Sequence, residues 1–112
     1  MQVTITGRHF EVTPPIKEHL VQKISKLEKY FPNLVQAHAI LSVEKYGHIA
    51  EVTLTAKNFK IAGKEQTEDM YASIDKIIQS IENRLKRHRD RVKQHKNKHG
   101  NERIVPLAQL DF

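Results

Sequence analysis

Apolar residues recur at helical spacing in the second half of the chain. Alternating intervals of three and four separate five of them: Tyr71, Ile74, Ile78, Ile81 and Leu85. This spacing places them on one side of an α-helix, which therefore needs a surface to pack on. Thr67 is the expected N-cap, and Glu68 and Asp69 would lie in the first turn, where negative charge suits the positive end of the helix dipole. The pattern predicts a long helix over residues 68–98.

A second helix is predicted in the first third of the chain. Its apolar positions again follow helical spacing: Ile16, Leu20, Ile24, Leu27 and Phe31. Thr13 precedes Pro14 and Pro15, and proline is tolerated in the first turn because the amide hydrogen that it lacks would have no partner there. Pro32 and Asn33 are expected to end this helix.

Alternation of apolar and polar residues predicts four strands. The first covers residues 1–6, and Gly7 then allows a turn. Three later segments alternate in the same way and are expected to form consecutive antiparallel strands: 36–44, 48–56 and 59–64. Tyr46-Gly47 and Lys57-Asn58 make the short connections between them.

These elements follow the order β-α-β-β-β-α, which predicts an α+β fold of two layers. Both helices would cover one face of a four-stranded sheet, since each has one apolar stripe to bury. The other face would be comparatively polar, with residues such as Glu51, Thr53, Thr55 and Lys60. An antiparallel sheet tolerates water on one side.

Positive charge is concentrated in the second half of the long predicted helix. The chain has 112 residues, a formal net charge of +6 and a pI near 9.7. Residues 84–98 contain one acid, Asp90, and eight basic residues: Arg84, Lys86, Arg87, Arg89, Arg91, Lys93, Lys96 and Lys98. Such a run can be a solvated helix end. Charges of nearly one sign repel one another unless a partner neutralises them, however, which favours binding to a polyanion.

A second basic strip is possible on the first predicted helix. Lys23, Lys26 and Lys29 follow one another at spacings of three along one flank, and His19 lies one turn earlier on the same side. These lysines either keep a surface helix soluble or contact the same polyanion, and the residues alone favour neither interpretation.

The composition excludes several classes of function. The chain has no cysteine, which removes disulfides, thiol catalysis and thiolate metal sites and fits a reducing compartment. No apolar run approaches the ~20 residues that span a bilayer, and the N-terminus has no signal-peptide core, so we expect a soluble cytoplasmic protein. A nucleic acid suits the charge better than a membrane surface, because the basic part of the helix keeps only Val92 as an apolar residue.

The sequence indicates no catalytic or metal site. It has no G-x-S-x-G nucleophile, and no glycine-rich loop precedes a helix as phosphate cradles require. His95 and His99 would lie one turn apart if the helix lasts that far, but no third ligand is near. We therefore expect no enzyme activity, no catalytic residues, no metal and no cofactor.

The last residues depart from both periodic patterns. His99, Gly100 and Asn101 are expected to end the long helix, and Pro106 disfavours regular structure beyond it. We expect a domain over residues 1–98 and a flexible tail over residues 99–112, because terminal residues are usually poorly ordered. The alternative is that the apolar residues of the tail dock on the sheet or on a partner.

Several short segments resemble one protein family. Residues 68–75, Glu-Asp-Met-Tyr-Ala-Ser-Ile-Asp, are similar to the D-M-Y-x-A/S-I-D signature of the ribosome hibernation factors, the group of hibernation promoting factor and ribosome-associated inhibitor A (protein Y). Residues 1–7, 26–31 and 93–95 are similar to the same family. The resemblance covers residues 1–98 and is to the short form.

This resemblance implies a fold like that of double-stranded RNA-binding domains and a function without catalysis. The family binds the small (30S) ribosomal subunit and its 16S rRNA in the channel for mRNA and for the A-site and P-site tRNAs, and thereby inhibits translation. The short promoting type also helps 70S ribosomes pair into 100S dimers alongside a ribosome modulation factor. We expect the free protein to be a monomer. The alternative is a general double-stranded RNA-binding or RNA chaperone module.

The resemblance also implies which cations contact rRNA. Lys23 and Lys26 match the first-helix lysines of the family. We expect nine residues to contact rRNA phosphates: Lys23, Lys26, Lys29, Arg84, Lys86, Arg87, Arg89, Arg91 and Lys93. Residues 79–85 depart from the usual D-K-L-x-R-Q-L, since two expected cations are missing and Arg84 lies one place later. The tail departs too, being neither an acidic extension nor a separate dimerising domain.

Overall fold

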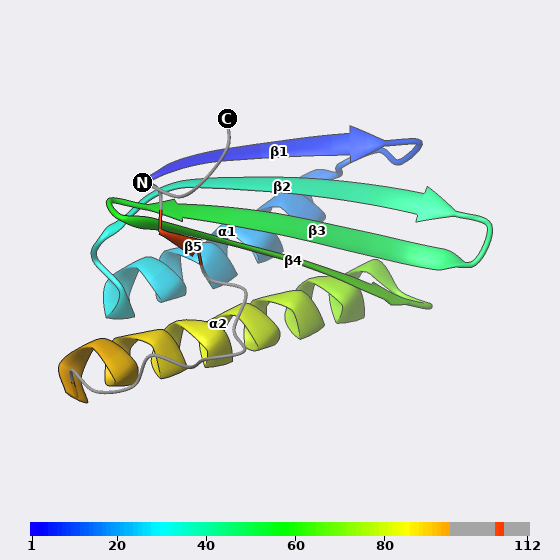
Figure 1. Cartoon of the computed structure of the whole chain (residues 1–112). Helices are drawn as coiled ribbons and strands as arrows, with labels where there is room; N and C mark the ends of the chain where they lie inside the picture. Colours follow the sequence, from blue (N-terminus) through cyan, green and yellow to red (C-terminus); the bar gives the residue numbers. More distant parts are fainter. Residues whose placement is uncertain (95–104, 107–112) are drawn as a thin grey trace.

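A sheet of four long strands forms one layer of the molecule (Figure 1). The computed structural model describes the backbone of residues 1–94 and 105–106 and the side chains of residues 1–90. The strands are β1 (Gln2–Arg8), β2 (Leu34–Glu44), β3 (Gly47–Ala56), β4 (Phe59–Thr67) and the two-residue β5 (Val105–Pro106). They lie side by side in sequence order, with β1 parallel to β2 and every later pair antiparallel.

Two helices, α1 (Pro14–Tyr30) and α2 (Met70–Gln94), cover one face of this sheet (Figure 1). The core lies between the layers, where α1 contributes Leu20 and Ile24, α2 contributes Ile74 and Ile81, and alternate residues of β2, β3 and β4 face them. The predicted two-layer β-α-β-β-β-α fold is confirmed. No helix in the described part of the chain is long and apolar enough to cross a bilayer.

The start of α2 differs from the prediction. Asp69, and not Thr67, caps the helix, because its carboxylate accepts a hydrogen bond from the Ala72 amide at 3.0 Å. The Thr67 hydroxyl instead donates to the Asp69 carbonyl oxygen at 2.7 Å and accepts from the Asp69 amide at 3.1 Å. Tyr71 is 39% exposed and lies outside the core, and Ile77 is buried in addition to the predicted isoleucines.

The chain reverses later after β1 than predicted. Gly7 belongs to β1, and the reversal falls at His9, whose φ of 56° lies in the left-handed region. Gly7 is still required, because a Cβ at this position would collide with the carbonyl oxygen of Phe10. The predicted connection at Lys57-Asn58 is confirmed, whereas the turn predicted at Tyr46-Gly47 falls one residue earlier, at Lys45-Tyr46, because Gly47 begins β3.

The two-residue strand β5 was not predicted as regular structure, but it agrees with the alternative that apolar residues of the tail dock on the sheet. Val105 pairs with Lys60, and Pro106 pairs with Phe59, at the edge of β4. Proline is tolerated on an edge strand because no further strand needs its missing amide hydrogen. The rest of the predicted tail, residues 99–104 and 107–112, lies outside the described residues.

Candidate nucleic-acid interface

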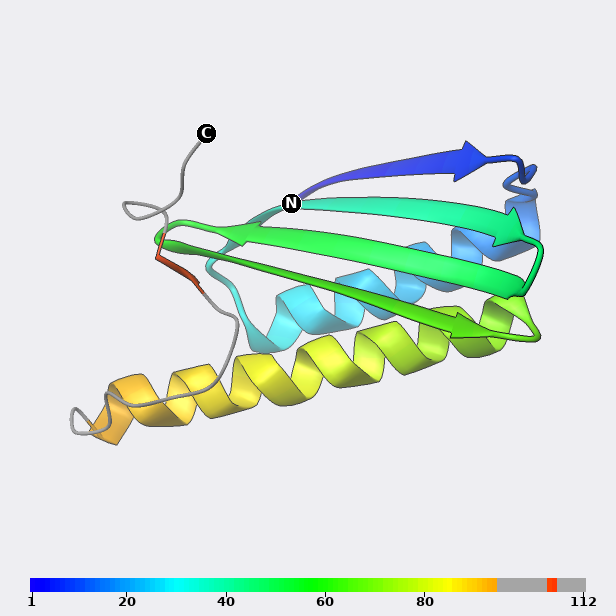
Figure 2. The same ribbon diagram turned by 45° about the vertical axis from the view of Figure 1, so that its right-hand side comes forward.

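The two helices run side by side in the same direction (Figures 1 and 2). This direction follows from the topology: β1 is parallel to β2, and two antiparallel pairings bring β4 back to the direction of β1. Each helix begins where one of these strands ends, so α1 and α2 start at the same end of the sheet. The longer α2 therefore continues past the end of α1, which lies beside Arg89, and its last turns extend beyond the ends of the strands (Figure 2).

At the N-terminal end of the helix pair, charges on facing side chains neutralise one another. The Asp75 carboxylate of α2 lies 2.7 Å from Nε2 of His19 and 3.7 Å from Nζ of Lys23, both on α1. The His19 ring also packs edge-on against Tyr71, with the ring centroids 5.0 Å apart. These contacts join the two helices and occupy Lys23, the first of the predicted rRNA contacts.

The same end is tied to the sheet by hydroxyl groups. The buried Ser73 side chain donates a hydrogen bond to the His48 carbonyl oxygen of β3 at 2.7 Å. The Thr67 and Ser73 hydroxyls are also 2.7 Å apart. Together with the Asp69 cap, these bonds fix the first turn of α2 on β3 and β4.

Between the helices lies a narrow groove of about 100 Å³. Lys23, Lys26 and Tyr30 line it from α1, and Asp75 and Glu82 line it from α2. Because lysines face carboxylates across the groove, its middle carries little net charge. The excess of positive charge lies nearer the C-terminal ends of both helices.

The C-terminal end of the helix pair presents cations from both helices. Lys26 and Lys29 of α1 are exposed, as are Lys86, Arg87 and Arg89 of α2. Lys86 pairs with Glu82 at 3.3 Å, one turn earlier on the same helix. The negative ends of both helix dipoles lie here, so cations are stabilised at this end of each helix. The structure thus brings together predicted residues that are far apart in sequence.

Arg84 lies apart from this group. Its side chain is half-buried against the edge of the sheet, where Nη2 donates a hydrogen bond to the Ala62 carbonyl oxygen of β4 at 2.7 Å. Gly63 makes room for it, because a Cβ there would lie 2.8 Å from Nη2. Arg84 therefore fastens α2 to β4, a role that its position in the basic run did not indicate.

The last predicted cations are placed by their backbone alone. Arg91 and Lys93 belong to α2, but their side chains are outside the described residues. His95 and His99, considered as metal ligands, are also outside them. Among the residues that the structure describes, no cluster of three or more histidine or acidic side chains is placed to hold a metal ion.

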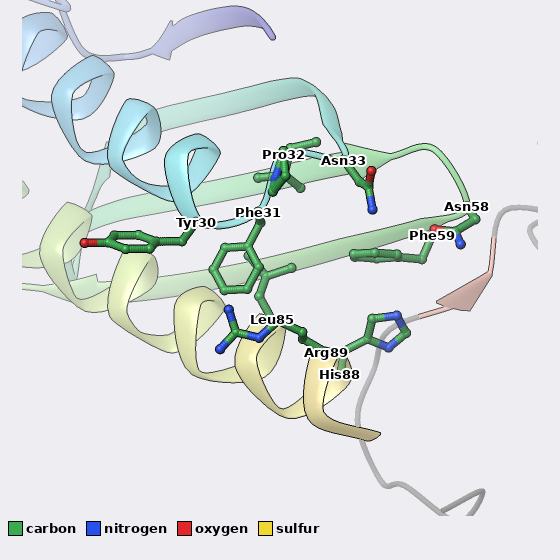
Figure 3. A pocket seen from close by; sticks show the side chains of 10 residues that line it. Tyr30, Phe31, Pro32, Asn33, Asn58, Phe59, Leu85, His88 and Arg89 are labelled. Atoms are coloured by element: carbon green, nitrogen blue, oxygen red, sulfur yellow. The ribbon is translucent and has the colours of Figure 1, made fainter. Parts of the chain in front are cut away.

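Aromatic side chains that the sequence analysis did not single out as a site gather at the cationic end (Figure 3). The Arg89 guanidinium lies 5.1 Å from the centroid of the Phe31 ring, and the His88 and Phe59 ring centroids are 4.5 Å apart. Tyr30 is 60% exposed beside them. The sequence showed Phe31 as an apolar helix position and Arg89 as a basic one, but only the packing of α1 on α2 shows that they meet.

Comparisons with known proteins find similarity over most of the chain. Residues 3–93 match the family described as "Sigma 54 modulation protein / S30EA ribosomal protein". The chain is 40% identical over 95 residues to the ribosome hibernation promoting factor of Salmonella typhimurium and 38% identical to that of Escherichia coli K12. Each alignment covers 85% of this chain and 100% of the relative.

Solved structures share the fold. A ribosomal subunit interface protein from Coxiella burnetii has a TM-score of 0.76 and 19% identity, with 80% of this chain and 99% of that chain covered. The N-terminal domain of Thermus thermophilus Protein Y has a TM-score of 0.72 and 26% identity, with 79% and 99% covered. Both likenesses cover most of this chain.

Proposed function

We propose, from the premise that the chain belongs to the sigma 54 modulation protein / S30EA ribosomal protein family, that it binds the small ribosomal subunit in the channel for mRNA and tRNA. Membership of this family, which the signature at residues 68–75 predicted, makes the chain a ribosome-associated protein with a translation-inhibiting role and not an enzyme. The site of binding and the consequences for ribosome dimers are our proposal.

One observation carries the proposal: cations from two helices converge at one end of one surface. Lys26 and Lys29 come from α1, and Lys86, Arg87 and Arg89 come from α2. Packing of the helices fixes the spacing of the two groups, so they form an array that can match the phosphates of folded rRNA. Such contacts position a protein without reading base sequence.

Inhibition would then follow from occupancy. A folded body held in the channel through 16S rRNA phosphates excludes tRNA and message by its volume, and no bond needs to be made or broken. Binding to ribosomes would place the protein in the cytoplasm. We further propose that the bound protein stabilises 100S dimers of 70S ribosomes, together with a ribosome modulation factor. Comparing 100S yields for the full chain and for a chain without residues 99–112 tests whether the tail contributes.

Cosedimentation with purified small subunits across a salt series tests the channel proposal. The variant Lys26→Glu/Arg87→Glu should bind more weakly, with a salt slope smaller by about 0.7–0.9 for each phosphate that the variant no longer neutralises. The matched control is Lys45→Glu/Lys64→Glu, which changes the net charge equally on the β2–β3 turn and on β4. Wild-type protein that fails to cosediment even at low salt, or that leaves tRNA and mRNA binding unchanged, would end the proposal.

A general double-stranded RNA-binding or RNA chaperone module remains the second candidate. The observation that favours it is the same array of cations, which has no requirement for a particular base sequence. The two candidates differ in their preference for substrate. Equal affinity for an arbitrary RNA duplex and for small subunits would favour the general module, whereas a strong preference for subunits favours the hibernation role.

A further inference from the structure

A pocket opens at the cationic end of the molecule, where the α1–β2 connection, the β3–β4 turn and α2 meet (Figure 3). Its volume is about 240 Å³. Phe31, Leu34, Phe59 and Leu85 line it and belong to the buried core. Pockets for drug-sized ligands usually measure about 300–1,000 Å³, so this one suits a single ring system.

Polar and aromatic groups surround this apolar floor. Tyr30, which is 60% exposed, and Arg89 line the pocket, and the Arg89 guanidinium lies 5.1 Å from the centroid of the Phe31 ring. Asn33 and Asn58 also line the pocket, from the two connections (Figure 3). A carboxamide offers both a donor and an acceptor, which is what the edge of a nucleobase requires. Aromatic rings and guanidinium planes are surfaces on which flat rings stack.

The charge around the pocket selects an anionic partner. None of the described residues that line it is acidic. Arg89 lines it, and the Asp90 carboxylate lies 3.9 Å from the Arg89 Nε outside the lining. Lys29 in the last turn of α1 adds exposed positive charge close by, and so does Lys86 of α2, although Lys86 also pairs with Glu82. A ligand that combines a flat ring with a phosphate complements all of these groups at once. A nucleotide has this combination.

We propose that the pocket receives one unstacked base of ribosomal RNA while the neighbouring cations hold its flanking phosphates. This inference rests on the proposed function, because it assumes that the cationic end faces rRNA. RNA loops and bulges display unpaired bases that stack on aromatic or guanidinium groups, whereas the bases of a continuous duplex are hidden in its stack. The pocket therefore gives the protein a means of distinguishing irregular rRNA from plain duplex that an array of cations lacks.

Two RNA hairpins with the same stem test the pocket, one carrying a single bulged 2-aminopurine nucleotide and the other fully paired. Wild-type protein should bind the bulged hairpin about tenfold more tightly, since stacking of one base supplies this much, and the 2-aminopurine fluorescence should change on binding. Tyr30→Ala should abolish the preference while leaving the affinity for the paired hairpin unchanged. Tyr30→Phe keeps the ring and should keep the preference.

Tyr46→Ala is the matched control. Tyr46 is 79% exposed on the β2–β3 turn, at the opposite end of the sheet from the pocket (Figure 1). Its removal should leave both affinities as in the wild type. Thermal unfolding of each variant shows whether the fold is intact, and both tyrosines are exposed enough that little change is expected.

Equal wild-type affinity for the two hairpins overturns the inference, and so does a preference that survives in Tyr30→Ala. Cosedimentation with small subunits, run in parallel, separates this result from the proposed function. Protein that cosediments but shows no preference for the bulge refutes the pocket and leaves the ribosomal role standing. A preference for the bulge without cosedimentation supports the pocket as an RNA site and refutes the ribosomal role.

Discussion

The two ends of the helix layer handle charge in opposite ways. At the N-terminal end, Asp75 faces both His19 and Lys23, and the Asp69 carboxylate caps α2. At the C-terminal end, Lys26 and Lys29 are exposed, and Arg89 stacks on an aromatic ring. At the N-terminal end Asp75 pairs with side chains of the other helix, whereas at the C-terminal end exposed cations outnumber the acids Glu82 and Asp90, which pair with Lys86 and Arg89. Different parts of the same two helices therefore hold the fold together and expose positive charge.

The separation has a physical basis in what each half packs on. The first half of α2 lies on β3 and β4, where Ile74 and Ile77 are buried and Ser73 is hydrogen-bonded to the sheet. Leu85 in the second half is still buried, and only the last turns of α2 pass the ends of the strands (Figure 2). Substitutions of residues packed on the sheet should therefore change stability, and substitutions of the exposed cations near the end of α2 should change binding.

The largest effect is expected from Ile74→Ala. Ile74 lies on the buried face of the first half of α2 and is fully buried. The loss of its side chain leaves a cavity that should lower the free energy of unfolding by about 2–5 kcal/mol. Denaturant titration followed by circular dichroism measures this cost. At temperatures where the variant is folded, its affinity for small subunits should match the wild type. A smaller loss of stability than for Lys29→Ala would contradict the division of roles.

A smaller loss of stability is expected from Asp69→Ala. The substitution removes the cap of α2, so the free energy of unfolding should fall by about 1 kcal/mol. Asp69→Asn retains a side-chain oxygen that can accept from the Ala72 amide and should recover most of this loss. Thr67→Ala, at the residue that the sequence indicated as the cap, tests the correction directly. If Thr67→Ala alone removed a cap and Asp69→Ala did not, the structural assignment would be wrong.

Arg89→Gln should change stability only slightly. The contact of Arg89 with Phe31 is partly exposed to solvent, and such cation–π pairs contribute about 0.5–1 kcal/mol. The same substitution removes one charge and one stacking surface from the pocket, so binding to the bulged RNA hairpin should weaken more than unfolding shifts. A melting-temperature series alongside the binding series checks this ratio, and a change in stability alone would mark Arg89 as structural.

The smallest effect is expected from Asp75→Asn, which tests the comparison of the two helix ends most directly. This change removes the carboxylate that pairs with Lys23 and contacts His19, so the N-terminal end loses one negative charge. Because the pair is largely exposed, stability should fall by no more than about 1 kcal/mol. Affinity for small subunits at low salt should rise slightly or stay equal. A marked loss of binding would mean that the paired end also contacts rRNA.

Much of this fold was predictable because its elements have clear periods. The stripe from Ile16 to Phe31 and the alternation over 48–56 each have one regular solution, and the proline pair at Pro14 and Pro15 marks a helix start. The cap of α2 was predicted two residues too early, since Thr67 and Asp69 are both good caps and only the hydrogen bonds distinguish them. Local sequence patterns predicted the helices and strands well, and their first and last residues less well.

The sequence predicted which cations belong to the candidate site, but it did not predict how they are arranged in space. Arg84 and Arg87 look equivalent in the sequence, yet one bonds to the edge of β4 and the other is exposed. The pocket joins side chains from three separate segments, represented by Phe31, Phe59 and Arg89. The periodicity of one segment does not predict contacts between separate segments, because these contacts depend on how the sheet places the segments in space.

The overhang of α2 beyond the strands makes its reach adjustable. Each added helical turn would carry the cations about 5.4 Å further from the body, while the core between sheet and helices would stay as it is. Insertion or deletion of whole helical turns after Leu85 would therefore change how far the cations at the end of α2 extend from the body, without changing the fold. The same fold could in this way fit RNA grooves of different depth, because only the length of the α2 end would differ.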